Sequence, residues 1–262
     1  MLTAIIQARM NSSRLPGKVM MKINGKPMLY HVIKQTLYSK KIDNVIVATT
    51  NSKNDKIIVN YCREHNHDYF CGSTNDVLDR YYQCAKKFNY DPVIRISADS
   101  PLIDPQIIDR VLQKFLNNSY DYVSNNIEKI KNKWVDSTCN FPIGTVIEVS
   151  TFNALKSAWK KSKLYSEREH VFPYIQTHPE LFVVSNIKIR KNLSHIRITV
   201  DKKNDLKFVR KIFTNFSNNK QKITLADIEK LVNLQPEIIK INNNTAFDEG
   251  HKKSISHNKK IH

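Results

Sequence analysis

The sequence is poor in glycine, which makes up only 5 of its 262 residues. Two common phosphate-binding motifs, G-x-x-x-x-G-K-[ST] and G-x-G-x-x-G, need glycines at fixed spacing so that backbone N–H groups can approach a phosphate. Neither motif occurs in the chain. The sequence therefore excludes a Walker A nucleotide site and a dinucleotide-binding fingerprint, and any phosphate site must be built from other residues.

Cysteine is also scarce, and the chain has no C-x-x-C pair. Its four cysteines, Cys62, Cys71, Cys84 and Cys139, show no regular spacing, so we expect reduced, half-buried thiols and neither a zinc site nor a disulfide framework. No apolar run approaches the roughly 20 residues of a membrane span, and no basic leader precedes the first apolar segment. We therefore expect a cytoplasmic protein with no membrane partner.

Acidic residues are outnumbered: 24 Asp and Glu face 42 Lys and Arg, which gives a net charge of +18. Such an excess favours polyanionic partners or an acidic substrate. Sequence-nonspecific nucleic-acid binding is therefore an alternative function. It is disfavoured because the basic residues form no stripe with interleaved aromatics on any predicted helix, and because no nucleic-acid-binding module is recognisable.

What the sequence does contain is a regular alternation of short apolar runs and amphipathic segments. Strands are expected in the first half at 2–8, 44–50, 68–71 and 91–97, with helices between them at 27–38, 54–65 and 75–88, the last capped by Asn75. Alternating strands and helices predict a three-layer α/β/α fold around a mostly parallel sheet. Ligands of such sheets bind at the carboxyl ends of the strands.

The second half continues the pattern less regularly. Residues 126–138 are low in apolar side chains and predict a loop or flexible insertion, and the polar residues 242–262 predict a mobile tail after a single domain formed by residues 1–241. Further strands are expected at 144–150 and 195–200, and helices at 151–162, 166–182 with a break near Pro173, and 203–213, while residues 225–233 close the ordered part.

A basic loop follows the first predicted strand. The stretch "IIQARMNSSRLPGK", residues 5–18, carries Arg9, Arg14 and Lys18 but no acid. A Ser- and Asn-rich loop with three cations can offer backbone N–H groups and charge-assisted donors to phosphate oxygens. We interpret it as a triphosphate cradle; the alternative is a solvated basic loop.

Two acids follow predicted strands and could face this loop. Asp99 comes directly after the strand at 91–97, and Asp201 after the strand at 195–200. Carboxylate and phosphate oxygens together can fill the octahedral shell of Mg²⁺. Taken singly, each acid could also be a helix cap or loop acid, but the pair opposite a cationic loop favours a magnesium site.

The same segments resemble a known family. "IIQARMNSSRLPGKVMMKINGKPML" is similar to the opening signature of the sugar-acid cytidylyltransferases, and Gln7 and Met10 are typical of the spore-coat polysaccharide biosynthesis branch, which is related to the CMP-acylneuraminate and CMP-Kdo synthetases. The resemblance runs from residue 2 to about 213. Five later segments match that branch in order: "NVIVATT", "GSTNDVLDRYY", "RISADSPLIDP", "EREHVFPYI" and "RITVDKKNDL".

The resemblance implies a nucleotide-diphospho-sugar transferase-like fold, related to the A-type glycosyltransferases, and a homodimer. It also implies transfer of CMP from CTP to an acidic acceptor, most simply a nonulosonic or ulosonic acid, with Mg²⁺ as cofactor and pyrophosphate as product. The metal would be held by Asp99 and Asp201, which with Arg14 and Lys18 are the candidate catalytic residues. The implied nucleotide site comprises Gln7, Ala8, Arg9, Ser12, Ser13, Arg14, Lys18, Thr49, Asp79, Arg80 and Ser97.

Some matches leave alternatives open. "VDKKNDL" has Lys202 and Lys203 where the family has Thr and Pro, which makes Asp201 the less certain metal ligand. Asp79 and Arg80 match a pair near the nucleotide or form a couple on a helix surface.

The acceptor site is expected in the second half, with Glu148, Arg168 and His170 as candidates. Glu148 could instead be a satisfied strand carboxylate, and Arg168 could pair with Glu169 along a helix. A phosphonate acceptor is a second possibility. A glycosyltransferase is disfavoured because no D-x-D metal motif is present.

Overall fold

The computed structural model describes residues 1–216, 222–243 and 254–258. Its centre is a seven-stranded sheet with the order β11-β7-β10-β6-β1-β4-β5. Only β10 runs antiparallel to its neighbours, so the prediction of a mostly parallel sheet is confirmed. The strands are β1 (Thr3–Gln7), β4 (Asn44–Thr50), β5 (Asp68–Gly72), β6 (Val93–Ser97), β7 (Tyr122–Ser124), β10 (Glu148–Ser150) and β11 (Val184–Asn186).

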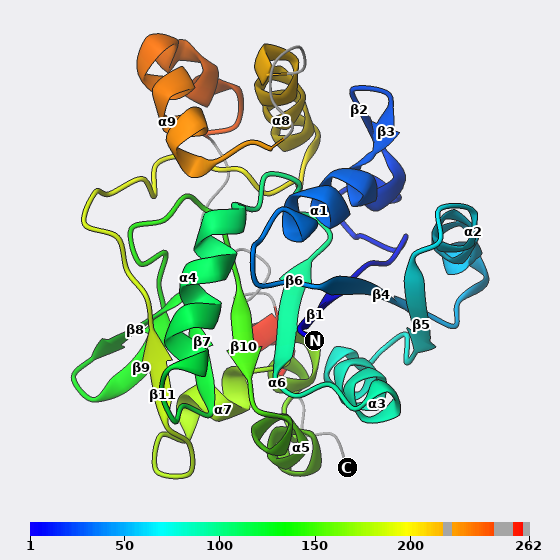
Figure 1. Ribbon diagram of the computed structural model, residues 1–262, viewed down its shortest axis with the longest axis vertical. Coiled ribbons are helices and arrows are strands. Elements are labelled where there is room, and N and C mark those ends of the chain that lie inside the picture. Colours follow the sequence, from blue (N-terminus) through cyan, green and yellow to red (C-terminus); the bar gives the residue numbers. More distant parts are fainter. Residues whose placement is uncertain (217–221, 244–253, 259–262) are drawn as a thin grey trace.

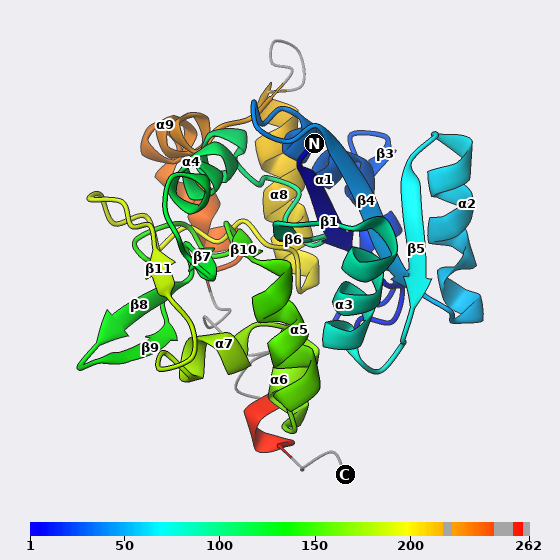
Figure 2. The ribbon, with the colours of Figure 1, turned by 60° about the horizontal axis from the view of Figure 1, so that its bottom comes forward.

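Helices cover both faces of the sheet (Figure 1, Figure 2). One face packs against α1 (Met28–Leu37), α2 (Lys56–Glu64), α4 (Pro105–Leu116), α8 (Lys203–Phe216) and α9 (Leu225–Leu234). The other packs against α3 (Val77–Phe88), α5 (Phe152–Lys161) and α7 (Pro173–Thr177), with the short α6 (Tyr165–His170) beside α3. The three-layer prediction is therefore confirmed.

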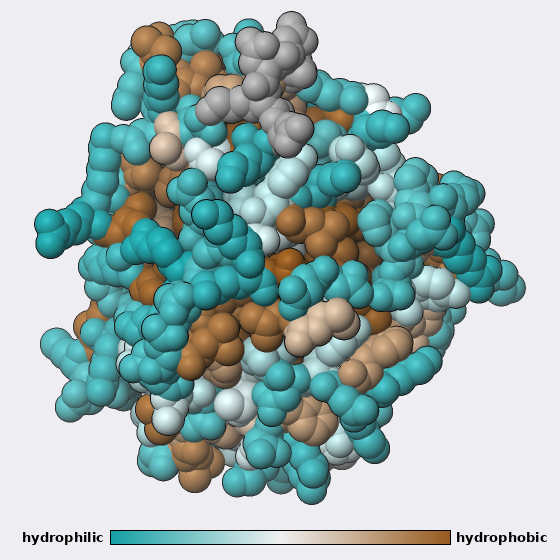
Figure 3. Space-filling model, viewed as in Figure 1, coloured by the Kyte–Doolittle hydropathy of each residue, from teal (hydrophilic) through white to brown (hydrophobic). Residues whose placement is uncertain are grey.

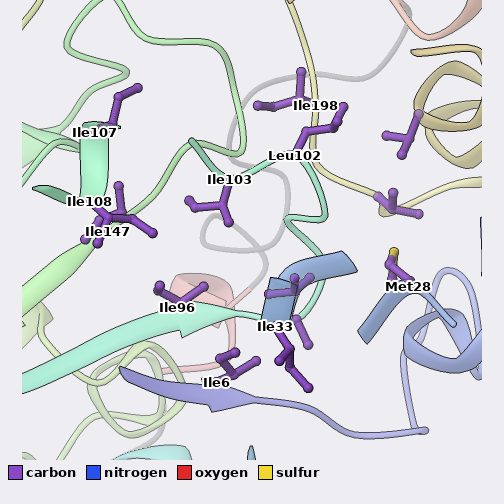
Figure 4. Close-up of a cluster of buried hydrophobic side chains, with 14 of the residues drawn as sticks. Ile6, Met28, Ile33, Ile96, Leu102, Ile103, Ile107, Ile108, Ile147 and Ile198 are labelled. Atoms are coloured by element: carbon purple, nitrogen blue, oxygen red, sulfur yellow. The ribbon is translucent and has the colours of Figure 1, made fainter. Parts of the chain in front are cut away.

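The apolar runs of the central strands are buried on both sides, as is typical of parallel sheets. Ile6 and Ile96 pack with Met28 and Ile33 of α1 (Figure 4), whereas Ile5, between two residues of that face, packs against α3 on the opposite side. On the face shown in Figure 3, hydrophilic side chains cover most of the surface, and hydrophobic ones show as smaller patches between them. Among the described residues, no helix is long and apolar enough to cross a membrane.

Local signals place most helix starts. Pro105 occupies the first turn of α4 and Asp104 accepts a hydrogen bond from the Gln106 N–H, while Thr151 caps α5. The cap of α3 is Asp76 and not Asn75, because its carboxylate accepts from the Asp79 N–H. Small elements complete the fold: β2 (Lys22–Ile23), β3 (Lys26–Pro27), and 3-10 turns η1 (Lys18–Met20), η2 (Lys53–Asp55) and η3 (Pro236–Ile241).

The predicted loop at 126–138 is wrong, because the segment forms a hairpin of β8 (Ile127–Ile130) and β9 (Lys133–Asp136). Lys131 and Asn132 make its two-residue turn with φ of 46° and 64°. Two consecutive residues with positive φ match the twist of a tight hairpin. The segment carries few apolar residues because Ile127 is the one residue of the two strands that is fully buried.

The strand predicted at 195–200 is also wrong. Only Arg197 pairs, in an isolated bridge with Ile143, while Ile196, Ile198 and Val200 are buried in the core. The alternating apolar residues serve packing, and the backbone bonds go to several partners; the Val200 N–H, for example, donates to the Asp99 carbonyl oxygen at 2.9 Å. This path brings residue 201 beside residue 99.

The structure describes two parts of the predicted tail, residues 242–243 and 254–258, and both contact the domain. The Asn242 amide is buried and donates to the Arg197 carbonyl oxygen at 3.1 Å and to Asp205 Oδ1 at 3.0 Å, so the packed domain extends beyond residue 241. Residues 254–258 contact α6, where Asn258 Oδ1 accepts from the Ser166 N–H at 2.9 Å. The rest of the predicted tail, 244–253 and 259–262, lies outside the described residues.

Candidate active site

A pocket of about 610 Å³ opens at the carboxyl ends of β1 and β6. This is where ligands of parallel sheets are expected, and the size suits a small-molecule ligand. Its walls come from the loop after β1, from α6 and from the segment 254–258. Ten of the predicted site residues line it: Gln7, Arg9, Ser12, Ser13, Arg14, Lys18, Ser97, Asp99, His170 and Asp201.

The loop after β1 is held by backbone contacts around Met10. The Met10 N–H donates to Asp55 Oδ1 at 2.7 Å, and its carbonyl oxygen accepts from the N–H groups of Ser12 and Gly17 at 2.9 and 2.8 Å. Gly17 has a φ of 72°, a left-handed conformation that glycine adopts without strain. Leu15 is buried in the core. The loop thus folds back on itself, so that its polar side chains line the pocket.

Lys18 lies between the two predicted acids. Its Nζ is 2.8 Å from Asp99 Oδ2 and 3.0 Å from Asp201 Oδ1, and it also donates to the Val200 carbonyl oxygen at 2.8 Å. Burial disfavours the ammonium, but the two carboxylates outweigh this effect and raise the pKa of Lys18. Burial likewise favours the neutral acid at Asp99, yet Lys18 lowers the pKa of that carboxyl. The cluster therefore holds a buried positive charge between two carboxyl groups.

Asp201 is the more heavily compensated acid. Arg14 contacts its Oδ1 at 2.7 Å, and Arg197 contacts its Oδ2 at 2.6 Å while donating to Asp205 Oδ1 at 3.0 Å. Asp205 in turn accepts from the N–H groups of Asp201 and Lys202 at the start of α8. This network, which includes Arg197, a residue that the sequence analysis did not select, fixes the Asp201 carboxylate.

The geometry of Asp99 and Asp201 suits a cation, since both converge on one ammonium group. No cluster of three or more His, Cys, Asp or Glu able to hold a metal occurs among the residues with described positions. A hard divalent cation at this place would need further oxygen ligands, and phosphate and water oxygens are the usual ones for Mg²⁺. The donor set therefore fits a metal that arrives with a phosphate ligand.

The floor of the pocket holds a second buried ion pair. Arg95, on β6, forms an ion pair through Nη1 with Glu148 of β10 and donates through Nε to Gln7 Oε1 at 3.1 Å. Glu148 also accepts from the Tyr122 hydroxyl at 2.7 Å, and that hydroxyl accepts from Gln176 Nε2 at 3.0 Å. Glu148 is thus a satisfied strand carboxylate below the pocket lining.

The wall formed by α6 contacts the loop after β1 and the segment 254–258. Glu169 pairs with Arg9 at 2.7 Å, and not with Arg168, the pairing that the sequence analysis left open. His170 Nε2 lies 2.8 Å from Ser254 Oγ. Ser254 and His257 line the pocket together with Tyr165 of α6.

Six predicted site residues lie outside the pocket lining: Ala8, Thr49, Asp79, Arg80, Glu148 and Arg168. Asp79 accepts from Trp159 Nε1 at 2.8 Å, and Arg80 is 1% exposed and donates to the Ser73 carbonyl oxygen at 2.9 Å, so they do not form a surface couple. Arg168 pairs with the helix cap Asp76. Asp79, Arg80 and Arg168 thus link neighbouring segments of the chain.

The sequence analysis missed several lining residues, among them Arg95 on β6. The sequence could have indicated Arg95, because Arg95 and the predicted site residue Ser97 are two positions apart on a strand and therefore share a face. The contributions of Tyr165, Ser254 and His257 had no comparable signal, because they come from segments distant in sequence from the loop.

Comparison with known proteins gives a consistent result. A family model described as Cytidylyltransferase matches residues 3–255. The chain is 36% identical to an uncharacterized protein of Methanocaldococcus jannaschii, over 93% of this chain and 95% of that protein. It is 28% identical to the spore coat polysaccharide biosynthesis protein SpsF of Bacillus subtilis, over 89% of this chain and 94% of that protein. The resemblance to this branch is therefore confirmed.

Two further likenesses extend this result. A 3-deoxy-manno-octulosonate cytidylyltransferase of Pelobacter propionicus is 30% identical over 49% of this chain and 55% of that protein. The structure of a cytidylyltransferase from Leptospira borgpetersenii superposes with a TM-score of 0.82 at 28% identity, covering 94% of this chain and 98% of that one. The expected nucleotide-sugar transferase type of fold is confirmed.

Proposed function

The chain belongs to the cytidylyltransferase family and is a CTP-dependent nucleotidyltransferase, and from this premise we propose that it transfers CMP to the hydroxyl of a sugar acid. The observation that carries the proposal is the basic loop with Arg14 and Lys18 facing Asp99 and Asp201 across one pocket. The 3-deoxy-manno-octulosonate cytidylyltransferase relative and the spore coat polysaccharide relative SpsF support a sugar acid as the acceptor. A phosphonate acceptor is the alternative at the same site.

Asp99 and Asp201 are the residues that would hold Mg²⁺ in this proposal. When bound, the metal would neutralise charge on the phosphates. In the structure the Lys18 ammonium lies between the two carboxylates. A bound metal would compensate the same two acids, and Lys18 would then be available to phosphate oxygens.

The reaction forms a bond between the acceptor oxygen and the α-phosphorus of CTP. It breaks the bond between the α-phosphorus and the oxygen that bridges the α- and β-phosphates. Pyrophosphate leaves, and the acceptor hydroxyl loses its proton. Negative charge therefore grows on the leaving group, and Arg14 and Lys18 would stabilise it through charge-assisted hydrogen bonds. Ser12 and Ser13, which line the same part of the pocket, would add neutral donors. Most of the catalysis is then positioning and charge neutralisation.

The test is calorimetric binding of CTP, UTP, ATP and GTP, each with and without Mg²⁺. We expect a clear preference for CTP that depends on the metal, followed by pyrophosphate release when a sugar acid is added. A panel of sugar acids and phosphonates then separates the two acceptor classes. Equal, weak binding of all four nucleotides that disappears on adding salt would contradict the proposal, because it would show a generic polyanion site.

A further inference from the structure

We infer that Arg95 binds the acid group of the acceptor at the floor of the pocket, and that Glu148 and Gln7 fix the orientation of its guanidinium. This inference rests on the proposed function and adds the residue that selects an acidic acceptor. The sequence analysis placed Gln7 in the nucleotide site and Glu148 in the acceptor site, and it did not select Arg95.

Arg95 is held on two sides by the protein. Its Nη1 pairs with Glu148, its Nε donates to Gln7 Oε1 at 3.1 Å, and its guanidinium carbon lies 5.9 Å from the centre of the Tyr81 ring. A guanidinium has five N–H donors. No described residue accepts a hydrogen bond from Nη2 of Arg95. The side chain is 13% exposed and lines the pocket, so donors remain for a ligand there.

Glu148 acts on Arg95 and not on a ligand. It is 2% exposed, and its two oxygens are engaged by Arg95 and by the Tyr122 hydroxyl. Burial disfavours the Arg95 cation, but Glu148 outweighs this effect and keeps the pKa of Arg95 above its usual value. Glu148 is therefore a positioning residue, which replaces its predicted role as an acceptor contact.

Gln7 gains a defined orientation from the same contact. An arginine N–H can only donate, so the Gln7 side-chain oxygen must face Arg95 and its amide NH₂ must face elsewhere. Gln7 also lines the pocket. The floor thus offers hydrogen-bond donors from both residues, which suits a carboxylate because its oxygens only accept.

The other cations of the lining pair with acids of the pocket wall, and the proposed function assigns Arg14 and Lys18 to the triphosphate. Arg14 and Lys18 contact Asp201, and Arg9 contacts Glu169. Arg95 also lies deeper in the sheet: it is two residues before Ser97, or about 6.6 Å along the strand at 3.3 Å per residue. An acid group bound there would be separated from the negatively charged triphosphate at the rim.

The experiment compares the wild type with Arg95→Met and with the double variant R95M/E148M. Removing both partners avoids leaving an uncompensated buried carboxylate, so the double variant serves if the single one does not fold. The acceptor is 3-deoxy-manno-octulosonate, an acylneuraminate or a hydroxyethylphosphonate, whichever the wild type uses, together with its neutral amide or diester. Arg63→Met is the matched control, because Arg63 also lies over a tyrosine ring, 5.5 Å from the centre of Tyr69, but outside the pocket lining.

We expect the Arg95 variants to raise the KM for the acid by roughly 10- to 100-fold, as loss of hydrogen bonds to a charged group does. The KM for CTP should stay within about twofold, and the preference for the acid over its neutral analogue should disappear. Arg63→Met should change neither the KM for the acid nor the preference for the acid over its neutral analogue. A folded R95M/E148M that keeps the acid preference, or that loses CTP affinity to the same degree, would overturn the inference.

Failure of the proposed function is distinguishable from this outcome because it shows in the wild type. If the wild type binds CTP but transfers CMP to none of these acids, both the proposed function and the role of Arg95 are contradicted. If the wild type uses an acid and the variants retain the preference for it, only the role of Arg95 is contradicted.

Discussion

At the scale of single residues, the pocket is built from charges that compensate one another. Lys18 bridges Asp99 and Asp201, Arg14 and Arg197 hold Asp201, and Glu148 holds Arg95. Removing one partner of a buried ion pair leaves an uncompensated charge, which costs more than the pair itself contributes. Substitutions here therefore affect both stability and catalysis, and each needs a folding measurement beside the rate.

Asp99→Asn tests the proposed metal ligand. The amide keeps the shape of the side chain but removes the negative charge, so we expect kcat to fall about 100-fold or more, measured as pyrophosphate release. The control is Asp43→Asn, whose carboxylate accepts from the Leu2 N–H at the opposite end of β1. Near-normal turnover in a folded Asp99→Asn protein would remove Asp99 from the metal site.

His31 predicts a pH dependence of stability. Burial lowers the pKa of His31 from 6.5, although its hydrogen bond to the Ile23 carbonyl oxygen acts in the opposite direction. The folded protein therefore binds fewer protons than the unfolded chain. The stability from a neutral His31 is fully present above pH 6.5 and is lost as pH falls from there through the lower folded pKa.

We expect the free energy of unfolding to fall by at most about 1.4 kcal/mol per pH unit for this one proton. Chemical denaturation between pH 7 and 5 measures the slope in the wild type and in His31→Gln, in which it should be smaller. An unchanged slope in the variant would show that other groups, such as His67 with its lowered pKa, cause the dependence.

At the scale of elements, the short α6 depends on partners distant in sequence. Its first turn donates from the Ser166 N–H to Asn258, and its last residue, His170, contacts Ser254. A helix of this length has little stability of its own. The C-terminal segment thus helps to fix one wall of the pocket.

Truncation after Asn243 removes these contacts. We expect the KM for the acceptor to rise about 3- to 10-fold, in line with the loss of one or two hydrogen bonds, while the thermal midpoint of the domain changes little. Truncation after Asn258 is the matched control and should behave as the full chain does. Identical kinetics for the two truncated proteins would show that α6 holds its position without residues 254–258.

At the scale of the whole molecule, the net charge of +18 does not by itself define a polyanion-binding surface. Each cation of the pocket lining pairs with an acid in the lining or beneath it; these cations are Arg9, Arg14, Lys18 and Arg95. Charges on the outer surface are screened by salt over about 8 Å at physiological ionic strength. Nonspecific association and CTP binding should therefore respond differently to salt.

We expect duplex DNA to bind weakly at low salt and to be released at about 0.15 M salt, while CTP with Mg²⁺ still binds there. Fluorescence anisotropy of a labelled duplex and calorimetry of CTP, measured over the same salt series, give the comparison. DNA binding that persists while CTP binding is lost would favour the nucleic-acid alternative. The homodimer expected from the family resemblance stays a prediction, which light scattering would test.

The sequence by itself determined the alternating architecture and two parts of the pocket lining. The apolar runs of β1, β4 and β6 specify buried parallel strands, and the loop at 5–18 and Asp99 follow two of them directly. Because the carboxyl ends of parallel strands meet at one edge, local patterns were enough to place these residues together.

Only the tertiary structure decided how the charges are shared and what forms the floor and the far wall. Arg95 pairs with Glu148 across β6 and β10, Arg168 pairs with Asp76 instead of its helical neighbour, and Ser254 reaches α6 from the C-terminal segment. Each contact joins residues more than fifty positions apart, and side-chain spacing along the chain carries no information about such pairs. The segment at 195–200 differs from its prediction for the same reason, since alternating apolar residues record which side chains are buried and not which backbone groups pair.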